Sequence, residues 1–74
     1  MTRDEWLARF CEAAGVERPT SEDVRALLEL AATAAHASER TAAPIACYVA
    51  ARSGRTLAEL LRLAAEIGPA PDVV

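Results

Sequence analysis

Residues 20–37 read TSEDVRALLELAATAAHA, and this stretch decides the fold class. Thr20 or Ser21 is suited to cap a helix, because each offers a side-chain oxygen to the first free backbone amides. Acidic residues fill the first turn, where the helix dipole favours negative charge. Apolar residues then recur at helical spacing: Val24, Leu27, Leu28, Ala31 and Ala35. The spacing predicts an amphipathic helix over about 22–37.

The apolar face of this helix is wide, because Leu30 and Ala34 extend it beyond a single stripe. A wide apolar face has more surface to bury than one neighbouring helix covers. We therefore expect this helix to contact more than one other helix.

Local signals also predict a helix over 3–14. Thr2 and Glu5 form a capping box, in which the hydroxyl accepts an early backbone amide and the carboxylate reaches back. Gly15 ends the helix, since glycine readily adopts the left-handed conformation of a helix C-terminus. The apolar stripe of this helix comprises Trp6, Leu7, Phe10, Cys11 and Ala14.

Two shorter helices are predicted after residue 40. The first covers about 43–52 and has Pro44 in its first turn, where a missing amide hydrogen matters least. Gly54 stops this helix. A second capping box, Thr56 to Glu59, begins the last helix, and Gly68 ends it.

These four segments predict an all-α fold, a small bundle of about four short helices. No stretch has the period-two alternation typical of a half-buried strand. The connections are too short to separate domains and favour antiparallel neighbours. We expect one helical domain over residues 1–74, ordered over about 3–68, with a frayed tail at 69–74.

The core of such a bundle must be thin. Hydrophobic residues make up 53% of the 74-residue chain, but 18 of them are alanine, which favours helix and buries little area. A chain this short buries only about 60% of the surface that its unfolded form exposes. The larger apolar residues are Trp6, Leu7, Phe10, Val16, Val24, Leu27, Leu28, Leu30, Ile45, Tyr48, Val49, Leu57, Leu60, Leu61, Leu63 and Ile67.

The charges argue against nucleic-acid and membrane partners. The net charge is −3, all eight cations are arginine, and they are dispersed rather than clustered, whereas nucleic-acid affinity depends on clustered cations. No apolar run approaches the ~18 residues of a membrane span, and the N-terminus does not resemble a signal peptide. With only Cys11 and Cys47 as cysteines, we expect a reduced, cytoplasmic protein.

The residue types do not assemble a catalytic, cofactor or metal site. Cys11, Cys47 and His36 are widely spaced and supply too few ligands for structural zinc, so both thiols are predicted to be buried and unreactive. The acidic pairs lie at helix starts, where capping explains them. The three glycines are isolated, so no glycine-rich phosphate loop exists. We expect a protein that is not an enzyme.

The three aromatic residues, Trp6, Phe10 and Tyr48, are predicted to belong to the core. The alternative is that they form an exposed anchor, because protein interfaces favour tryptophan and tyrosine. In a thin bundle the apolar faces exceed what four short helices cover, and self-association would then complete their burial.

Several segments together resemble the family called domain of unknown function 6457. The resemblance covers roughly residues 4–67 and rests on an acidic-aromatic opening, an apolar helix, a central signature and an apolar helix that ends in glycine. Here these read Asp4-Glu5-Trp6-Leu7, Leu27-Leu28-Glu29-Leu30-Ala31, the stretch from Ala35 to Ile45, and the stretch from Tyr48 to Gly54. Family members usually have proline directly after the arginine of the signature, where this chain has Thr41, so we expect a different local turn.

The resemblance implies a small, mainly actinobacterial protein. Its relatives occur alone, or beside or fused to a domain like molybdenum-cofactor guanylyltransferases. That association implies an accessory role near molybdopterin nucleotide chemistry.

The resemblance also directs attention to His36, Glu39, Arg40 and Pro44, at the junction of the second and third helices. One reading makes His36 and Arg40, one helical turn apart, a pair that binds an anion or a partner. The other reading is structural: a cation at a helix C-terminus is favourable, and Arg40 can pair with Glu39 or a terminal carbonyl.

Three hypotheses for the function follow. The first is a non-enzymatic accessory or interaction module that acts with a protein partner, such as a molybdenum-cofactor nucleotidyltransferase. The second is a structural homodimeric helical bundle without a ligand site. The third, least supported, is a small-ligand-binding domain.

Overall fold

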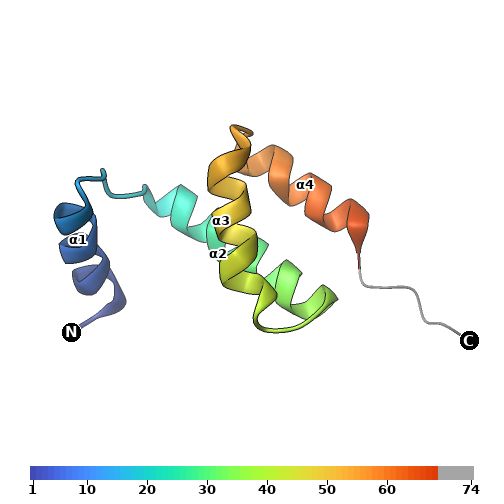
Figure 1. The fold of residues 1–74 in the computed structure, drawn as a ribbon, viewed down its shortest axis with the longest axis horizontal. Coiled ribbons are helices and arrows are strands. Elements are labelled where there is room, and N and C mark those ends of the chain that lie inside the picture. Colours follow the sequence, from blue (N-terminus) through green and yellow to red (C-terminus); the bar gives the residue numbers. More distant parts are fainter. Residues whose placement is uncertain (69–74) are drawn as a thin grey trace, which may run out of the picture.

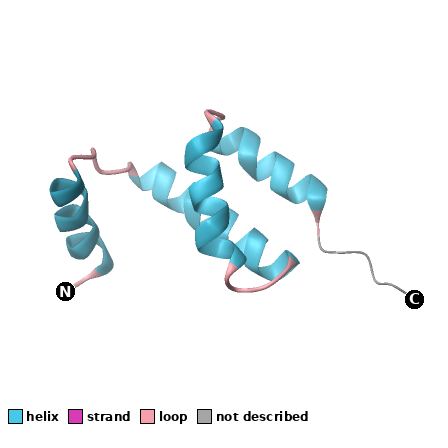
Figure 2. Ribbon diagram, in the orientation of Figure 1, coloured by secondary structure: helices cyan, strands magenta, loops and turns pink. Residues whose placement is uncertain are grey.

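A computed structural model describes residues 1–68, and this part of the chain contains four helices and no strand (Figures 1 and 2). The predicted all-α class is therefore confirmed. The predicted frayed tail, 69–74, lies outside the described residues. The helices are α1 (Arg3–Ala14), α2 (Ser21–Ala37), α3 (Ala42–Ser53) and α4 (Leu57–Ile67).

Threonine hydroxyls set three of the four helix starts. Thr2 Oγ1 accepts the amide hydrogen of Glu5 at 3.1 Å, and the same bond joins Thr20 to Asp23 and Thr56 to Glu59, also at 3.1 Å. Each bond satisfies one of the free amides at a helix N-terminus. The bounds of α1 match the prediction. Helix α2 begins one residue earlier than predicted because Thr20, and not Ser21, is its cap.

Glycine ends α1 and α3 in the left-handed conformation. Gly15 has φ 71° and Gly54 has φ 73°. After α1 the amide of Gly15 donates to the carbonyl of Glu12 at 3.2 Å, and that of Val16 donates to the carbonyl of Cys11 at 2.9 Å. These bonds satisfy carbonyls at the helix C-terminus, so the chain stops where the glycines predict. Helix α3 extends one residue beyond the predicted range at each end.

Helix α2 is the centre of the fold. It packs against both α3 and α4, and Figure 1 shows α3 crossing in front of it. The expectation that this helix contacts more than one neighbour is confirmed. Leu30 of α2 and Ala50 of α3 are the two buried residues of the described chain, each 6% exposed. The core is thus thinner than the list of large apolar residues predicts.

Helix α1 lies apart from this unit. It takes part in neither of the extensive helix contacts, and the segment from Gly15 to Thr20 carries the chain from its end to α2 (Figure 1). The bundle proper consequently consists of α2, α3 and α4. Much of the apolar stripe of α1 has no helix of this chain packed on it, which leaves those side chains exposed.

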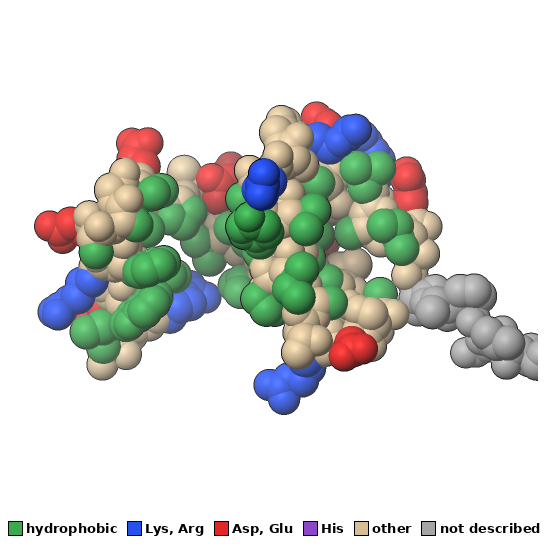
Figure 3. Space-filling view, viewed as in Figure 1, with side chains coloured by type: hydrophobic (Ala, Val, Ile, Leu, Met, Phe, Trp, Pro, Cys, Tyr) green, Lys and Arg blue, Asp and Glu red, His purple; other side chains and the backbone are tan. Residues whose placement is uncertain are grey.

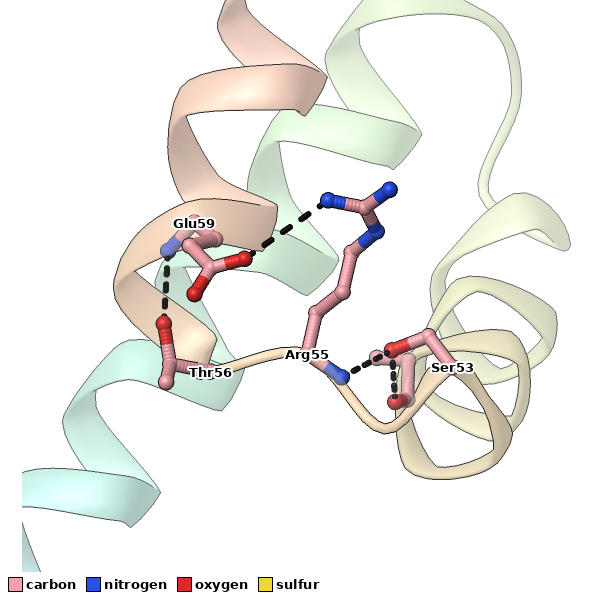
Figure 4. A network of polar contacts seen from close by, with 5 residues as sticks. Ser53, Arg55, Thr56 and Glu59 are labelled. Carbon is pink, nitrogen blue, oxygen red and sulfur yellow. Dashed lines mark hydrogen bonds and ion pairs between the residues drawn. The ribbon is translucent and has the colours of Figure 1, made fainter.

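A set of short polar contacts forms the corner between α3 and α4 (Figure 4). Ser53 Oγ donates to the carbonyl of Ala50 at 2.8 Å and accepts the amide hydrogen of Arg55 at 3.1 Å. Arg55 Nη1 lies 3.6 Å from Glu59 Oε2, in an exposed ion pair of a kind that contributes roughly 0–1 kcal/mol. The corner is therefore defined mainly by side-chain bonds to the backbone.

Replacing the α4 cap should lower stability measurably. Thr56→Ala removes the bond to the Glu59 amide and should cost about 1 kcal/mol, or about 4–8 °C in Tm for a chain of this size. Thr41→Ala is the matched control, because Thr41 is the N-cap of α3 but its side chain makes no capping bond. Thermal unfolding followed by circular dichroism measures both. Equal losses in the two variants would contradict the capping argument.

The two leucines Leu28 and Leu30 of α2 should differ sharply when shortened. Leu30→Ala opens a cavity at a site 6% exposed and should cost about 2–5 kcal/mol, enough to unfold much of the population. Leu28→Ala, at a site 54% exposed, should cost roughly 1 kcal/mol or less. Urea titrations give both values. A Leu28→Ala loss as large as that of Leu30→Ala would mean that α1 or another chain covers Leu28.

Candidate functional site

The four residues singled out from the sequence lie at the α2–α3 turn. His36 is in the last turn of α2, Glu39 and Arg40 are in the connection, and Pro44 is the third residue of α3. All four are exposed. Pro44 occupies the first turn of its helix, as predicted. The turn therefore presents a polar tip to solvent, beyond the packed part of the bundle.

Backbone bonds shape this turn. The amide of Ala42 donates to the carbonyl of Glu39 at 2.9 Å, and that of Ala43 donates to the carbonyl of Arg40 at 3.1 Å. The Glu39 carboxylate accepts a hydrogen bond from Thr41 Oγ1 at 3.4 Å. Thr41 thus takes part in the turn at the position where the resemblance leads one to expect proline.

The side chains of the turn do not form a closed site. Within residues 1–68 no hydrogen bond or ion pair joins His36, Glu39 or Arg40 to one another. At the end of α2, Ser38 Oγ donates to the carbonyl of Ala34 at 2.8 Å, so a serine hydroxyl satisfies this helix terminus. The Arg40 guanidinium is left to contact solvent or another molecule.

The prediction that the aromatic residues belong to the core is wrong. Trp6 is 54% exposed, Phe10 is 56% exposed and Tyr48 is 61% exposed. Trp6 and Phe10 stack on each other along α1, with ring centroids 5.1 Å apart and an angle of 26° between the rings. For Trp6 and Phe10 the physical reason is the position of α1, since no other described helix packs extensively against it. Tyr48 lies on a face of α3 that the contact with α2 leaves exposed.

A second exposed apolar face runs along α3. Ile45 is 62% exposed and Val49 is 57% exposed, and both lie within one turn of Tyr48. Arg52 Nη1 donates to Tyr48 Oη at 2.9 Å, and its guanidinium lies 5.6 Å from the ring centroid, within the range of a cation–π contact. This pair holds an aromatic ring and an arginine in a fixed arrangement on the surface.

Figure 3 shows the two faces together. Green, apolar side chains gather over α1 and over α3 on the side of the molecule that faces the viewer. We call them the α1 face (Trp6 and Phe10) and the α3 face (Ile45, Tyr48 and Val49). Large contiguous apolar patches on a soluble chain are typical of interaction sites.

The cysteines lie on separate helices. Cys11 on α1 and Cys47 on α3 are both free, and both are half-buried rather than buried as predicted. Cys47 borders a groove of about 390 Å³ between α2 and the α3–α4 corner, together with Leu27 and Leu57. Among residues 1–68 no three histidine, cysteine or acidic side chains lie close enough to hold a metal ion.

A further cleft lies between α1 and α2, where sequence reasoning placed no site. It has a volume of about 460 Å³. Arginines from α1, the connector and α2 line it: Arg3, Arg18 and Arg25. Arg18 and Arg25 are seven positions apart and lie on different elements, so no helical spacing connects them.

The fold and these faces define a small all-α protein whose larger apolar side chains are mostly exposed. Its sequence matches, over residues 1–70, the family described as Domain of unknown function (DUF6457), and the chain belongs to that family. No curated protein and no solved structure matches the chain. In the described residues no helix is both long and apolar enough to cross a bilayer.

The exposure of Trp6 can be measured directly, since it is the chain's sole tryptophan. Because its side chain is 54% exposed, acrylamide should quench its fluorescence in the folded, dilute protein almost as efficiently as in urea. Strong protection that persists on dilution would contradict the described position of α1. Protection that appears only at high concentration would show that a second copy covers the α1 face.

Proposed function

We propose that this chain is a non-enzymatic protein-interaction module. The observation that carries this proposal is the exposure of the α1 and α3 faces. Burial of aromatic rings and branched side chains releases about 25 cal/mol per Å² of apolar surface, so both faces favour contact with another protein. Tryptophan, tyrosine and arginine are the residues most enriched among energetically important interface contacts. The faces present Trp6 and Tyr48, and Arg52 contacts Tyr48 beside the α3 face.

The burial of the described residues supports the same proposal. Within residues 1–68 only Leu30 and Ala50 are buried, whereas ten large hydrophobic side chains are exposed. A chain that buries so few of its apolar side chains gains much of its hydrophobic stabilisation only when a partner covers the others.

A molybdenum-cofactor nucleotidyltransferase is the partner we propose. The support for this partner is the family resemblance, which implies that relatives of this chain occur beside or fused to a guanylyltransferase-like domain. The two free cysteines fit the reducing compartment, the bacterial cytoplasm, in which such a partnership would take place. The role is that of an accessory subunit.

The α2–α3 turn belongs to the proposed contact surface. His36, Glu39, Arg40 and Pro44 are exposed, and Pro44 directly precedes Ile45 of the α3 face. An apolar centre with a polar, charged edge is the usual layout of a protein interface. In this proposal the α3 face supplies the apolar centre, and Arg40 supplies a charge-assisted bond at its edge.

A homodimer is the second candidate, and the small core favours it. Only Leu30 and Ala50 are buried within residues 1–68, so a second copy placed on the α1 and α3 faces would supply the missing burial. Sedimentation across a wide concentration range discriminates the candidates. A strict monomer at high concentration rejects the homodimer.

The turn assignment can be tested by substitution. Co-purification of the chain with a candidate transferase should weaken about tenfold or more in Arg40→Ala, as truncation of an interface arginine commonly costs more than about 1.4 kcal/mol. Arg62→Ala, on the exposed side of α4, is the matched control and should bind as the unaltered chain does. Unchanged binding by Arg40→Ala removes the turn from the interface. Unchanged binding by Tyr48→Ala as well removes the interaction role of the α3 face.

A further inference from the structure

The cleft between α1 and α2 combines an apolar floor with a cationic edge. The floor comprises Leu7 of α1, Pro19 of the connector, and Val24 and Leu28 of α2. Its volume of about 460 Å³ lies within the range of protein ligand sites, ~300–1,000 Å³. Leu7 lies on the same apolar stripe of α1 as Trp6 and Phe10, about 60° around the helix from Phe10, so the cleft adjoins the α1 face.

The net charge of the cleft lining is positive, whereas that of the whole chain is negative. The whole sequence has eleven acidic residues and eight arginines, yet the lining contains three arginines and one acid, Asp4. Asp4 Oδ1 is already paired with Arg3 Nε at 3.0 Å. Within residues 1–68, Arg18 and Arg25 form no side-chain hydrogen bond or ion pair. Figure 3 shows blue side chains against α1 on the side toward α2.

We propose that this cleft docks an acidic amphipathic segment of a partner protein. One or two carboxylates of that segment pair with Arg18 and Arg25, in the planar, bidentate geometry that guanidinium groups favour. An apolar side chain of the same segment covers Leu7 and Leu28, which otherwise remain in contact with water. Because the cleft has both an apolar floor and a cationic edge, its ligand must carry carboxylates and an apolar side chain together.

Other occupants fit the cleft less well. A small inorganic anion would leave the floor of Leu7, Val24 and Leu28 uncovered. Nucleic acid would meet three arginines on a chain of net charge −3, too few cations for strong phosphate binding. An acidic protein segment satisfies the arginines and the floor together.

Docking has a structural consequence for α1. This helix lacks extensive contacts with the rest of the chain, so a segment between α1 and α2 touches both and holds them in one arrangement. The inference rests on the proposed interaction role and adds a second surface, separate from the α3 face and the α2–α3 turn. Binding should therefore stabilise the chain and change the surroundings of Trp6.

Two synthetic peptides test the proposal on the full chain. The acidic probe is two repeats of Glu-Leu-Leu-Glu-Glu-Leu-Ala, blocked at both ends, and the control has lysine in place of every glutamate. Titration calorimetry should show the acidic probe binding about tenfold or more tightly than the control, with an affinity that falls as salt rises. No binding of the acidic probe, or equal binding of the two peptides, overturns the proposal.

Charge reversal locates the site. Arg18→Glu combined with Arg25→Glu should weaken the acidic probe about tenfold or more, whereas Arg62→Glu, the same change on α4, should have the small effect of a distant charge. Circular dichroism verifies that each variant is folded, and the milder pair Arg18→Gln and Arg25→Gln replaces any variant that is not. Unaltered probe affinity in the double variant overturns the proposal.

The remaining outcomes separate the cleft from the other surfaces. Probe binding that Tyr48→Ala abolishes and the double arginine variant leaves intact supports the α3 face and rejects the cleft. Displacement of the probe by inorganic phosphate at constant ionic strength identifies a small-anion site and also rejects it. Self-association that the double arginine variant abolishes identifies a second copy as the occupant, which rejects the proposed partner. Loss of probe binding in the double variant alone supports the cleft, whatever Arg40→Ala does to transferase binding.

Discussion

The packing of α2 against both α3 and α4 holds the described structure together. Leu30 on α2 and Ala50 on α3 are the side chains that this packing buries, and no comparable contact joins α1 to the bundle. Because a domain's stability is a small difference between large terms, such a small core leaves little margin. Because the extensive contacts of α2 are with α3 and α4, α1 lies apart from the bundle, and the α1 face and the α3 face both stay exposed.

Alanine explains why a chain so rich in apolar residues has so small a core. It stabilises helices locally and therefore allows four of them to form from a short sequence. Its methyl group buries little surface, so the helices pack closely without covering the larger side chains around them. Trp6, Ile45 and Tyr48 consequently face solvent. The small side chain of alanine thus both keeps the core thin and leaves larger apolar side chains exposed for contact with a partner.

The candidate sites differ in how visible they were in the sequence. The family resemblance directed attention to the α2–α3 turn, where His36 and Arg40 are both exposed, and residue spacing alone did not distinguish these two from other polar residues. The sequence did not reveal the α1–α2 cleft, because only the path of the connector between the two helices brings Arg18 and Arg25 to the same cleft. The aromatic residues were assigned to a core because helical spacing reveals that a stripe is apolar, and not whether another helix covers it.

Local chemistry determined the helices. Thr2, Thr20 and Thr56 cap them and Gly15 and Gly54 end them through bonds that span at most a few residues, so the bounds were readable from the sequence within one residue. Tertiary structure alone decided which apolar faces meet. Burial depends on the distance between segments that are far apart in the chain. The periodicity of apolar residues does not encode the direction of the connector after Gly15, and this direction decides where α1 lies relative to α2.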